Sequence, residues 1–357
     1  MKKLLLLTAV VAMVFQGCET DFDVNAPWKD VAVVYGVLDQ SDSTHFIKIN
    51  KAFLGEVDVY TLAQIRDSSE YDPADIDVTI EERDEIGTVI NVWPVKYLTD
   101  SKKVGGTFYA PDQTLYYFDN ILDPSMDYKL VINNNKSGKV VSAITPLVSD
   151  FSFQPASYWQ NTSQVKVGFY KDNNYQVFSR AKWLTAENGR RYQLTLRFHY
   201  REVRLGVPNP DTLDLHIDWQ FGSITSVKLS GGQEIGVDIK GEDFYQFVAN
   251  NIEPASVNNV ERYIGTLDFI VDVGGEDLHT YIEVNEPSTG IVQERPEYSN
   301  ITDANGNYEI GIFSCRHTVS KIGASLSTSG NPYNSKTELC SGQYTYLLGF
   351  VNPGTCN

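Results

Sequence analysis

Short apolar runs of strand length, separated by turn residues, recur along this chain and restrict the folds open to it. Residues 31–38 form one continuous apolar run, and residues 44–50 alternate apolar with polar side chains. Asp, Gln and Ser residues at 39–43 supply a turn between them. Alternation with a period of two is typical of a strand, whereas an amphipathic helix repeats about every 3.6 residues. The start of the folded chain therefore predicts two successive strands.

The same pattern continues to residue 146. The further predicted strands are residues 76–82, 88–96, 115–118, 128–132 and 140–144. Residues 133–138 fit a hairpin loop, because the Asn and Gly residues there tolerate positive φ. Residues 60–68 form a helix-like stretch. Several short strands with regularly spaced turns predict an immunoglobulin-like β-sandwich domain for residues 30–146.

A larger antiparallel β domain is expected for residues 147–357, after a linker at 147–155. Its predicted strands are residues 165–170, 177–185, 192–204, 212–221, 263–273 and 278–284. Glu187-Asn188-Gly189 is typical of a type I′ turn and predicts a hairpin between strands 177–185 and 192–204. Gly274-Gly275 is expected to join the last two strands. The whole chain is therefore predicted to be all-β, with two β-sandwich-like domains.

One short helix is expected in this larger domain, over residues 241–252. Phe244, Phe247 and Val248 fall on one face of it. Glu242 and Asp243 lie in its first turn, where the helix dipole favours negative charge.

Residues 1–17 have the organisation of a bacterial lipoprotein signal peptide. Lys2 and Lys3 precede an apolar run at 4–15. That run is too short to cross a hydrocarbon core, which needs roughly 20 apolar residues. Gly17 supplies a small residue before Cys18, the expected lipidation site. A plain signal peptide and a single spanning helix are the alternatives.

Residues 18–29 are predicted to be a tether between the lipid and the first strand. Glu19, Asp21 and Asp23 make its start acidic, which resembles the surface-export signal of Bacteroidota lipoproteins. More than one acyl chain on Cys18, palmitate among them, anchors a protein firmly, whereas a single chain holds it only marginally. The expected location is the outer membrane with the protein at the cell surface, and the periplasmic face is the alternative.

The net charge narrows the range of partners. The chain has 46 acidic and 29 basic residues, which give a formal charge of −17 at pH 7. Such an excess of negative charge repels phosphate backbones, so nucleic acid is not an expected partner.

Three cysteines remain if Cys18 carries lipid, and an exported protein meets an oxidising compartment. Cys340 and Cys356 bracket a short C-terminal segment. We expect these two to form a disulfide, with Cys315 buried and free. No spacing among them matches a zinc-binding pattern.

Two neighbouring strands, 192–204 and 212–221, carry the most noticeable polar residues. Asp214, His216 and Asp218, with His199, suggest a metal site, since histidine and carboxylate suit several divalent ions. An antiparallel pairing around Pro208 would instead oppose Arg201 and Asp214, His199 and His216, Arg197 and Asp218. Such cross-strand ion pairs contribute only ~0.2–1 kcal/mol each on a solvated face. The ion-pair interpretation is favoured, so neither a metal nor a cofactor is expected.

Catalytic motifs are missing from the sequence. It contains no nucleophile elbow, no zinc-protease helix motif and no phosphate-binding glycine loop. Carboxylate pairs of the kind that hydrolyse glycosides are assembled in space, and 46 acidic residues leave that chemistry open.

Residues near the C-terminus resemble the motif of a known protein family. The residues that carry it are Tyr298, Asn300, Ile301, Gly311, Phe313, Ser314 and Arg316, in a Y-x-N-I block followed by G-x-F-S-x-R. With the signal peptide and V-V-Y-G-V-L at 33–38, the chain resembles an uncharacterised domain-of-unknown-function family of Bacteroidota outer-membrane lipoproteins. It departs from that pattern by inserting residues 303–310 and by placing Cys315 inside the second block. The resemblance implies a location near TonB-dependent outer-membrane transporters and implies no chemistry.

These observations predict a lipid-anchored binding or accessory subunit rather than an enzyme. A glycan or a peptide held for a transporter is the expected ligand. A surface carboxylate-dependent glycan hydrolase and a structural envelope protein are the alternatives. A concave pocket with two close carboxylates of raised pKa would favour the hydrolase, and an open aromatic groove would favour binding.

Overall fold

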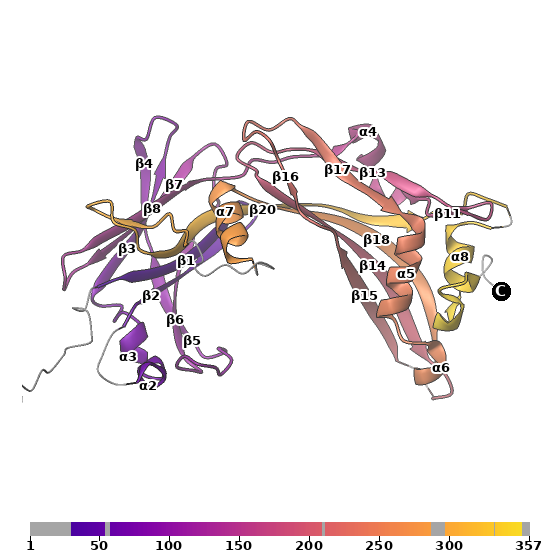
Figure 1. Ribbon diagram of the computed structural model, residues 1–357, viewed down its shortest axis with the longest axis horizontal. Coiled ribbons are helices and arrows are strands. Elements are labelled where there is room, and N and C mark those ends of the chain that lie inside the picture. The colour runs from indigo at the N-terminus through magenta and orange to yellow at the C-terminus, as the bar shows by residue number, and fades with distance from the viewer. Residues whose placement is uncertain (1–29, 54–57, 209–210, 287–296, 332, 352–357) are drawn as a thin grey trace, which may run out of the picture.

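The computed structural model describes residues 30–53, 58–208, 211–286, 297–331 and 333–351, which form an all-β fold. Strands dominate both halves of the molecule, as Figure 1 shows. One strand, β20 (Ile310–Leu326), runs from one half into the other. Both halves are built on this strand.

The N-terminal half is a β-sandwich of two layers. One layer has the strand order β20-β1-β2-β6-β5, and the other has the order β19-β8-β7-β3-β4. Their bounds are β1 (Ala32–Asp39), β2 (Thr44–Lys51), β3 (Ile76–Arg83), β4 (Val89–Pro94), β5 (Lys96–Asp100), β6 (Gln113–Asp119), β7 (Asp127–Asn134), β8 (Val140–Pro146) and β19 (Thr302–Asp303). Val34 and Ile47 of the first layer share one core with Ile80 and Leu130 of the second. Burying a side chain of this size contributes about 1.5–3 kcal/mol, so these alternating residues hold the layers together and confirm the predicted sandwich.

Glycines occur where β1 and β20 approach each other most closely. The two strands are parallel neighbours, and Gly36 pairs with Phe313. A Cβ at Gly36 would lie 3.0 Å from the Phe313 ring. A Cβ at Gly311, where φ is 111°, would lie 1.9 Å from the carbonyl oxygen of Val34. A side chain at Gly311 would therefore collide with the backbone of β1, whereas one at Gly36 would require the Phe313 ring to shift.

The C-terminal half is a long twisted sheet with a second layer of strands and a helix on one of its faces (Figure 1). The sheet has the order β15-β14-β18-β20, with β14 (Arg191–Arg204), β15 (Thr212–Gln220) and β18 (Val260–Gly274). A small sheet has the order β17 (Glu234–Lys240), β13 (Val177–Leu184) and β9 (Phe153–Gln154). The ring centroid of Phe178 on β13 lies 5.6 Å from that of Phe269 on β18. The helix α5 (Gly241–Asn251) adds Phe244, 5.8 Å from Phe198 of β14. The helix predicted over 241–252 is therefore confirmed.

Smaller elements complete the chain. They are α2 (Val59–Ala63), α3 (Arg66–Ser69), α4 (Ala156–Trp159), α6 (Ala255–Asn258), α7 (Glu276–Asn285), α8 (Ser335–Ser341), η1 (Thr162–Gln164), η2 (Tyr346–Leu348), β9 (Phe153–Gln154), β10 (Lys166–Val167), β11 (Tyr170–Lys171), β12 (Asn174–Tyr175), β13 (Val177–Leu184), β16 (Ile224–Thr225), β17 (Glu234–Lys240) and β21 (Phe350–Val351).

The hairpin predicted between strands 177–185 and 192–204 is wrong. Asn188 does have a positive φ of 59°, as the turn prediction requires. However, β13 pairs with β17 and β9, whereas β14 pairs with β15, β16 and β18. Trp183 and Tyr192 are both fully buried, with ring centroids 6.2 Å apart. The two strands thus belong to different sheets, and these rings pack against each other in the core between them.

Two further predictions also need correction. The strand predicted over residues 278–284 is the helix α7, which begins after Gly275 with Glu276 and Asp277 in its first turn. Those acids suit the positive end of the helix dipole, and the segment is helical despite its β-branched residues. The run 88–96 divides into β4 and β5, which join different layers of the sandwich.

Residues from beyond position 147 complete the N-terminal sandwich. β20 pairs with β1 from Val33–Ile310 to Asp39–Arg316, and β19 pairs with β8. A division into 30–146 and 147–357 therefore does not follow the sheets. Local periodicity does not reveal this pairing, since the parallel partners are more than 270 residues apart in sequence.

The switch between partners occurs at Arg316, which pairs with Asp39 on β1 and with Gly274 on β18. The next residue, His317, is buried there. Its Nε2 lies 3.1 Å from Asp150 Oδ1, and its Nδ1 lies 3.9 Å from Asp39 Oδ1. The imidazole thus connects the end of β1 with the segment between the two halves.

Electrostatics at this junction favour a charged histidine. Burial opposes the charge of His317, but the contacts with Asp39 and Asp150 outweigh burial and raise the pKa of the imidazole. Burial also opposes ionisation of Asp39, yet hydrogen bonds from His317 and Ser41 lower the pKa of this carboxyl group overall. Arg316 Nε lies 3.3 Å from Asp39 Oδ2 and adds to the stabilisation of the carboxylate. Protonation of the buried imidazole is therefore more favourable in the folded protein than in the unfolded chain.

His317→Gln should destabilise the protein most at mildly acidic pH. Because the folded-state pKa is raised, the stabilisation by the charged ring is complete below the unfolded pKa of about 6.5 and is lost as pH rises through the folded pKa. We expect a loss of about 1–3 kcal/mol in the free energy of unfolding near pH 6, shrinking at higher pH. Urea unfolding of wild type and variant from pH 5.5 to 9 measures this difference. The exposed His216→Gln is the control, and a loss that grows with pH would contradict the assignment.

Candidate functional site

The polar ladder of β14 and β15 has the register expected from the sequence. Arg197 pairs with Asp218, His199 with His216 and Arg201 with Asp214. Arg197 holds Asp218 in a bidentate ion pair, with Nε–Oδ1 of 2.7 Å and Nη2–Oδ2 of 2.8 Å. This hydrogen bonding lowers the pKa of Asp218. Arg201 Nε donates to Asp214 Oδ1 over 3.0 Å. Both acids therefore have cationic partners.

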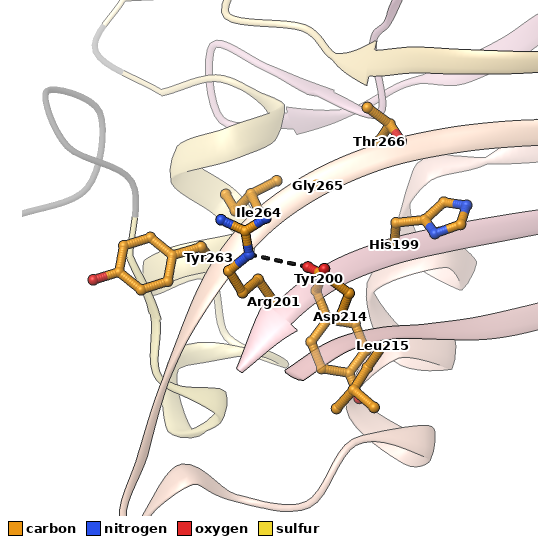
Figure 2. Close-up of a pocket in the computed structure, with 9 residues that line it drawn as sticks. All are labelled: His199, Tyr200, Arg201, Asp214, Leu215, Tyr263, Ile264, Gly265 and Thr266. Carbon is orange, nitrogen blue, oxygen red and sulfur yellow. Dashed lines mark hydrogen bonds and ion pairs between the residues drawn. The ribbon is translucent and has the colours of Figure 1, made fainter. Parts of the chain in front are cut away.

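A cavity of about 360 Å³ opens beside one end of this ladder. Figure 2 shows Arg201 and Asp214 joined across it, with His199 on one side and the backbone of β18 at Gly265 on the other. A bulge in the pairing of β14 with β18 creates the hollow, and a Cβ at Gly265 would lie 2.4 Å from the carbonyl oxygen of His199. The cavity is thus a product of local strand geometry.

Asp268 is the residue of this face that sequence reasoning missed. It is buried, and its Oδ2 lies 2.7 Å from His199 Nε2. Its Oδ1 accepts the backbone N–H of Gly323 over 2.8 Å. The polar residues alternating with the apolar ones of strand 263–273 were the available signal for it. His199 is therefore held by a carboxylate that is itself held by backbone.

This set of residues does not form a metal site in the described structure. The described residues contain no group of three or more His, Cys, Asp or Glu side chains arranged to hold an ion. Asp214, His216 and Asp218 lie along one exposed strand, and both acids are paired with arginines. The geometry supports the cross-strand ion-pair interpretation.

A larger concavity lies where the two halves meet, and we call it the junction groove. It encloses about 780 Å³ and is lined by Tyr35, Tyr281, Asn285, Glu297, Tyr298, Ser299, Tyr308, Glu309, Ile310 and Gly311. β1, α7 and the start of β20 all contribute residues to it. Its volume falls within the range of ~300–1,000 Å³ usual for small-molecule sites.

Four tyrosines make the lining of the junction groove largely aromatic. The rings of Tyr35 and Tyr281 meet edge to face, with centroids 6.3 Å apart. Burial and a hydrogen bond with Tyr281 raise the pKa of Tyr35 to about 12. Tyr308 has 76% of its surface exposed, and Tyr35 has 42%. The groove therefore presents aromatic surface to solvent.

The Y-x-N-I block forms one wall of the junction groove. Tyr298 donates its hydroxyl hydrogen bond to Asp277 of α7. Asn300 Nδ2 donates to Asp277 Oδ2 over 3.0 Å and to the carbonyl oxygen of Phe313 over 2.7 Å. The N–H of Phe313 donates to Asn300 Oδ1 over 3.0 Å. The Asn300 amide therefore occupies the edge of β20 in the way a neighbouring strand would.

Asn300 therefore caps the edge of β20. The residues that follow it form a turn and then the strand itself. Gly306 has a positive φ of 82° in a turn, and Ile310 to Phe313 begin the strand β20. Arg316 is exposed and lies beside Asp39.

Acidic residues with raised pKa values lie away from the groove. Among the described residues, burial raises the pKa of Glu338 on α8 and of Asp127 on β7. Glu338 accepts a hydrogen bond from the hydroxyl of Tyr175, and Asp127 lies at the start of its strand in the other half. The two carboxyl groups are therefore not a pair that could share a glycoside substrate.

Cysteine positions fit part of the expected pattern. Cys315 is buried and free, and burial raises the pKa of its thiol to about 11. Cys340 is disulfide-bonded. Its predicted partner Cys356 lies outside the described residues, so the pairing stays a prediction. The signal peptide, Cys18 and the tether also lie outside them.

We compared the chain with protein-family models and with curated protein sequences, and none of them matches it. The resemblance to outer-membrane lipoproteins therefore stays a prediction. None of the described helices has the length and apolar character needed to cross a membrane.

Adding micromolar Zn²⁺ or Ca²⁺ should leave the melting temperature unchanged, because the ladder acids already have guanidinium partners. An ion that binds only the folded state would stabilise it by ~2.7 kcal/mol at a hundredfold excess over Kd. Asp214→Asn and Asp218→Asn should each change the free energy of unfolding by no more than ~1 kcal/mol. A metal-dependent rise in melting temperature that disappears in Asp214→Asn would make the ladder a metal site.

Proposed function

We propose that this protein is a lipid-anchored binding subunit of the bacterial outer membrane, with the junction groove as its ligand site. The observation that carries the proposal is the junction groove itself. It combines four tyrosines with hydrogen-bonding groups from three separate segments of the chain. Apolar surface with a few convergent polar groups is the usual composition of a ligand site.

The anchor follows from the sequence. A basic start, a short apolar run and Gly17-Cys18 together favour export and lipidation. The disulfide at Cys340 is compatible with an oxidising compartment outside the cytosol.

An accessory role beside a transporter is the part of the proposal that rests on the family resemblance. A protein tethered by residues 18–29 would hold its ligand close to the membrane and raise the local concentration near a TonB-dependent transporter. Transfer requires only that the ligand leave an open groove. The exposed rim at Tyr308 and Asn285 is consistent with such access.

The anchor and the site can be tested together with membranes that carry the full-length protein. The probes are neutral oligosaccharides, acidic oligosaccharides and short peptides, each retained and measured on washed membranes. We expect at least one probe to bind the wild type and Tyr308→Ala to weaken that binding about tenfold, or ~1.4 kcal/mol. Cys18→Ser should move the protein to the soluble envelope fraction with its affinity unchanged.

Tyr346→Ala is the matched control, since Tyr346 is 60% exposed and belongs to η2 rather than to the groove. Binding that Tyr308→Ala and Tyr346→Ala reduce equally, or that neither reduces, would remove the junction groove as the site. Unchanged membrane retention of Cys18→Ser would remove the anchor.

A further inference from the structure

We infer that the junction groove binds an uncharged oligosaccharide chain and discriminates against acidic glycans and against peptides. This inference rests on the proposed function and specifies its ligand. Three features of the groove support it: its charge, its exposed rings and the state of the neighbouring strand edge.

The charge of the groove disfavours anions. Among the residues that the structure describes, its lining contains Glu297 and Glu309 and neither lysine nor arginine. Two basic residues are paired with acids of the groove or of α7: Lys139 with Glu309 at 2.6 Å and Arg191 with Glu286 at 2.5 Å. An anionic ligand would meet the negative charge of the exposed Glu297, and the described part of the lining offers it no lysine or arginine. Uronic acids and sulfated sugars are therefore poor ligands.

The exposed rings suit a sugar. One face of a pyranose ring consists largely of C–H groups, and hydroxyl groups surround its rim. The exposed rings of Tyr308 and Tyr35 offer apolar surface for the C–H face, as aromatic rings do in apolar contacts. Asn285, Glu297 and Ser299 supply donors and acceptors around them for the hydroxyl groups. The groove thus matches both parts of a neutral sugar.

The strand edge beside the groove is closed to a peptide. Extended peptides bind most readily by adding a strand to a free sheet edge, which requires successive unpaired N–H and C=O groups. On β20, Asn300 occupies the N–H and C=O of Phe313. The N–H of Gly275 donates to the carbonyl of Cys315 over 3.1 Å. A peptide would have to displace both partners, whereas a sugar chain does not use the edge.

The test uses calorimetry on the detergent-solubilised full-length protein with four probes: a neutral glucan oligosaccharide series, a neutral xylan series, an oligogalacturonate and a short neutral peptide. At least one neutral series should bind, and the oligogalacturonate and the peptide should bind at least tenfold more weakly. Tyr308→Ala should weaken binding of the neutral sugar at least tenfold, and Tyr346→Ala should leave it unchanged. Glu297→Gln should narrow the discrimination against the oligogalacturonate by at least threefold.

Tyr35→Phe is a further variant, which keeps the ring of Tyr35 and removes only its hydroxyl group. It should retain binding of the neutral sugar within threefold. Groove-dependent binding of the oligogalacturonate or the peptide in preference to neutral sugars would overturn the ligand class and leave the groove as a site. Failure of every probe to bind in a Tyr308-dependent manner would contradict this inference and the proposed function together.

Discussion

The hydrogen-bond ladder of β20 is the constraint on which the rest of this structure depends. Its first part pairs in parallel with β1, and its second part pairs antiparallel with β18. Arg316 takes part in both pairings, so the register of one sheet fixes the register of the other. A slip of one residue would turn every core side chain of β20 to the opposite face. The two halves are therefore held in a defined arrangement, and the groove between them has a defined shape.

Near Phe313, β20 pairs with β1 on one side only. The segment from Tyr298 to Asn300 covers the other edge of the strand at this point. Asn300 satisfies both backbone groups of Phe313, and Asp277 fixes the Asn300 amide. Tyr298 contacts the same carboxylate and lines the junction groove. One hydrogen-bond network thus closes the sheet edge, fixes α7 and positions one ring of the groove.

Sequence reasoning succeeded where the determining interactions are local. The ladder register from Arg197–Asp218 to Arg201–Asp214 follows from one turn and from the alternation of charge on two adjacent strands. The helix α5 follows from its amphipathic spacing. α7 was missed because Thr280, Ile282 and Val284 favour a strand, although the acids after Gly275 suit the first turn of a helix.

The candidate site could not be predicted, because its residues come together only through long-range strand pairing. Tyr35, Tyr281, Tyr298 and Tyr308 come from segments that only the long-range pairing of β1 with β20 brings together. Each is one of 21 tyrosines, and no spacing distinguishes it from the others. The motif that contains Tyr298 and Asn300 did mark the right region of the chain. Its contacts explain that motif as an edge cap and as one wall of a binding groove.

Native-state hydrogen exchange tests most directly whether the shared strand makes the two halves one cooperative unit. Amides of β1 and β2 should exchange with the same opening free energy as amides of β14 and β18, and both should equal the global free energy of unfolding. Exchange of β14 and β18 through an opening at least ~2 kcal/mol below that of β1 and β2, or the reverse, would contradict the account. It would mean that the halves unfold separately and that β20 does not hold the groove in one arrangement.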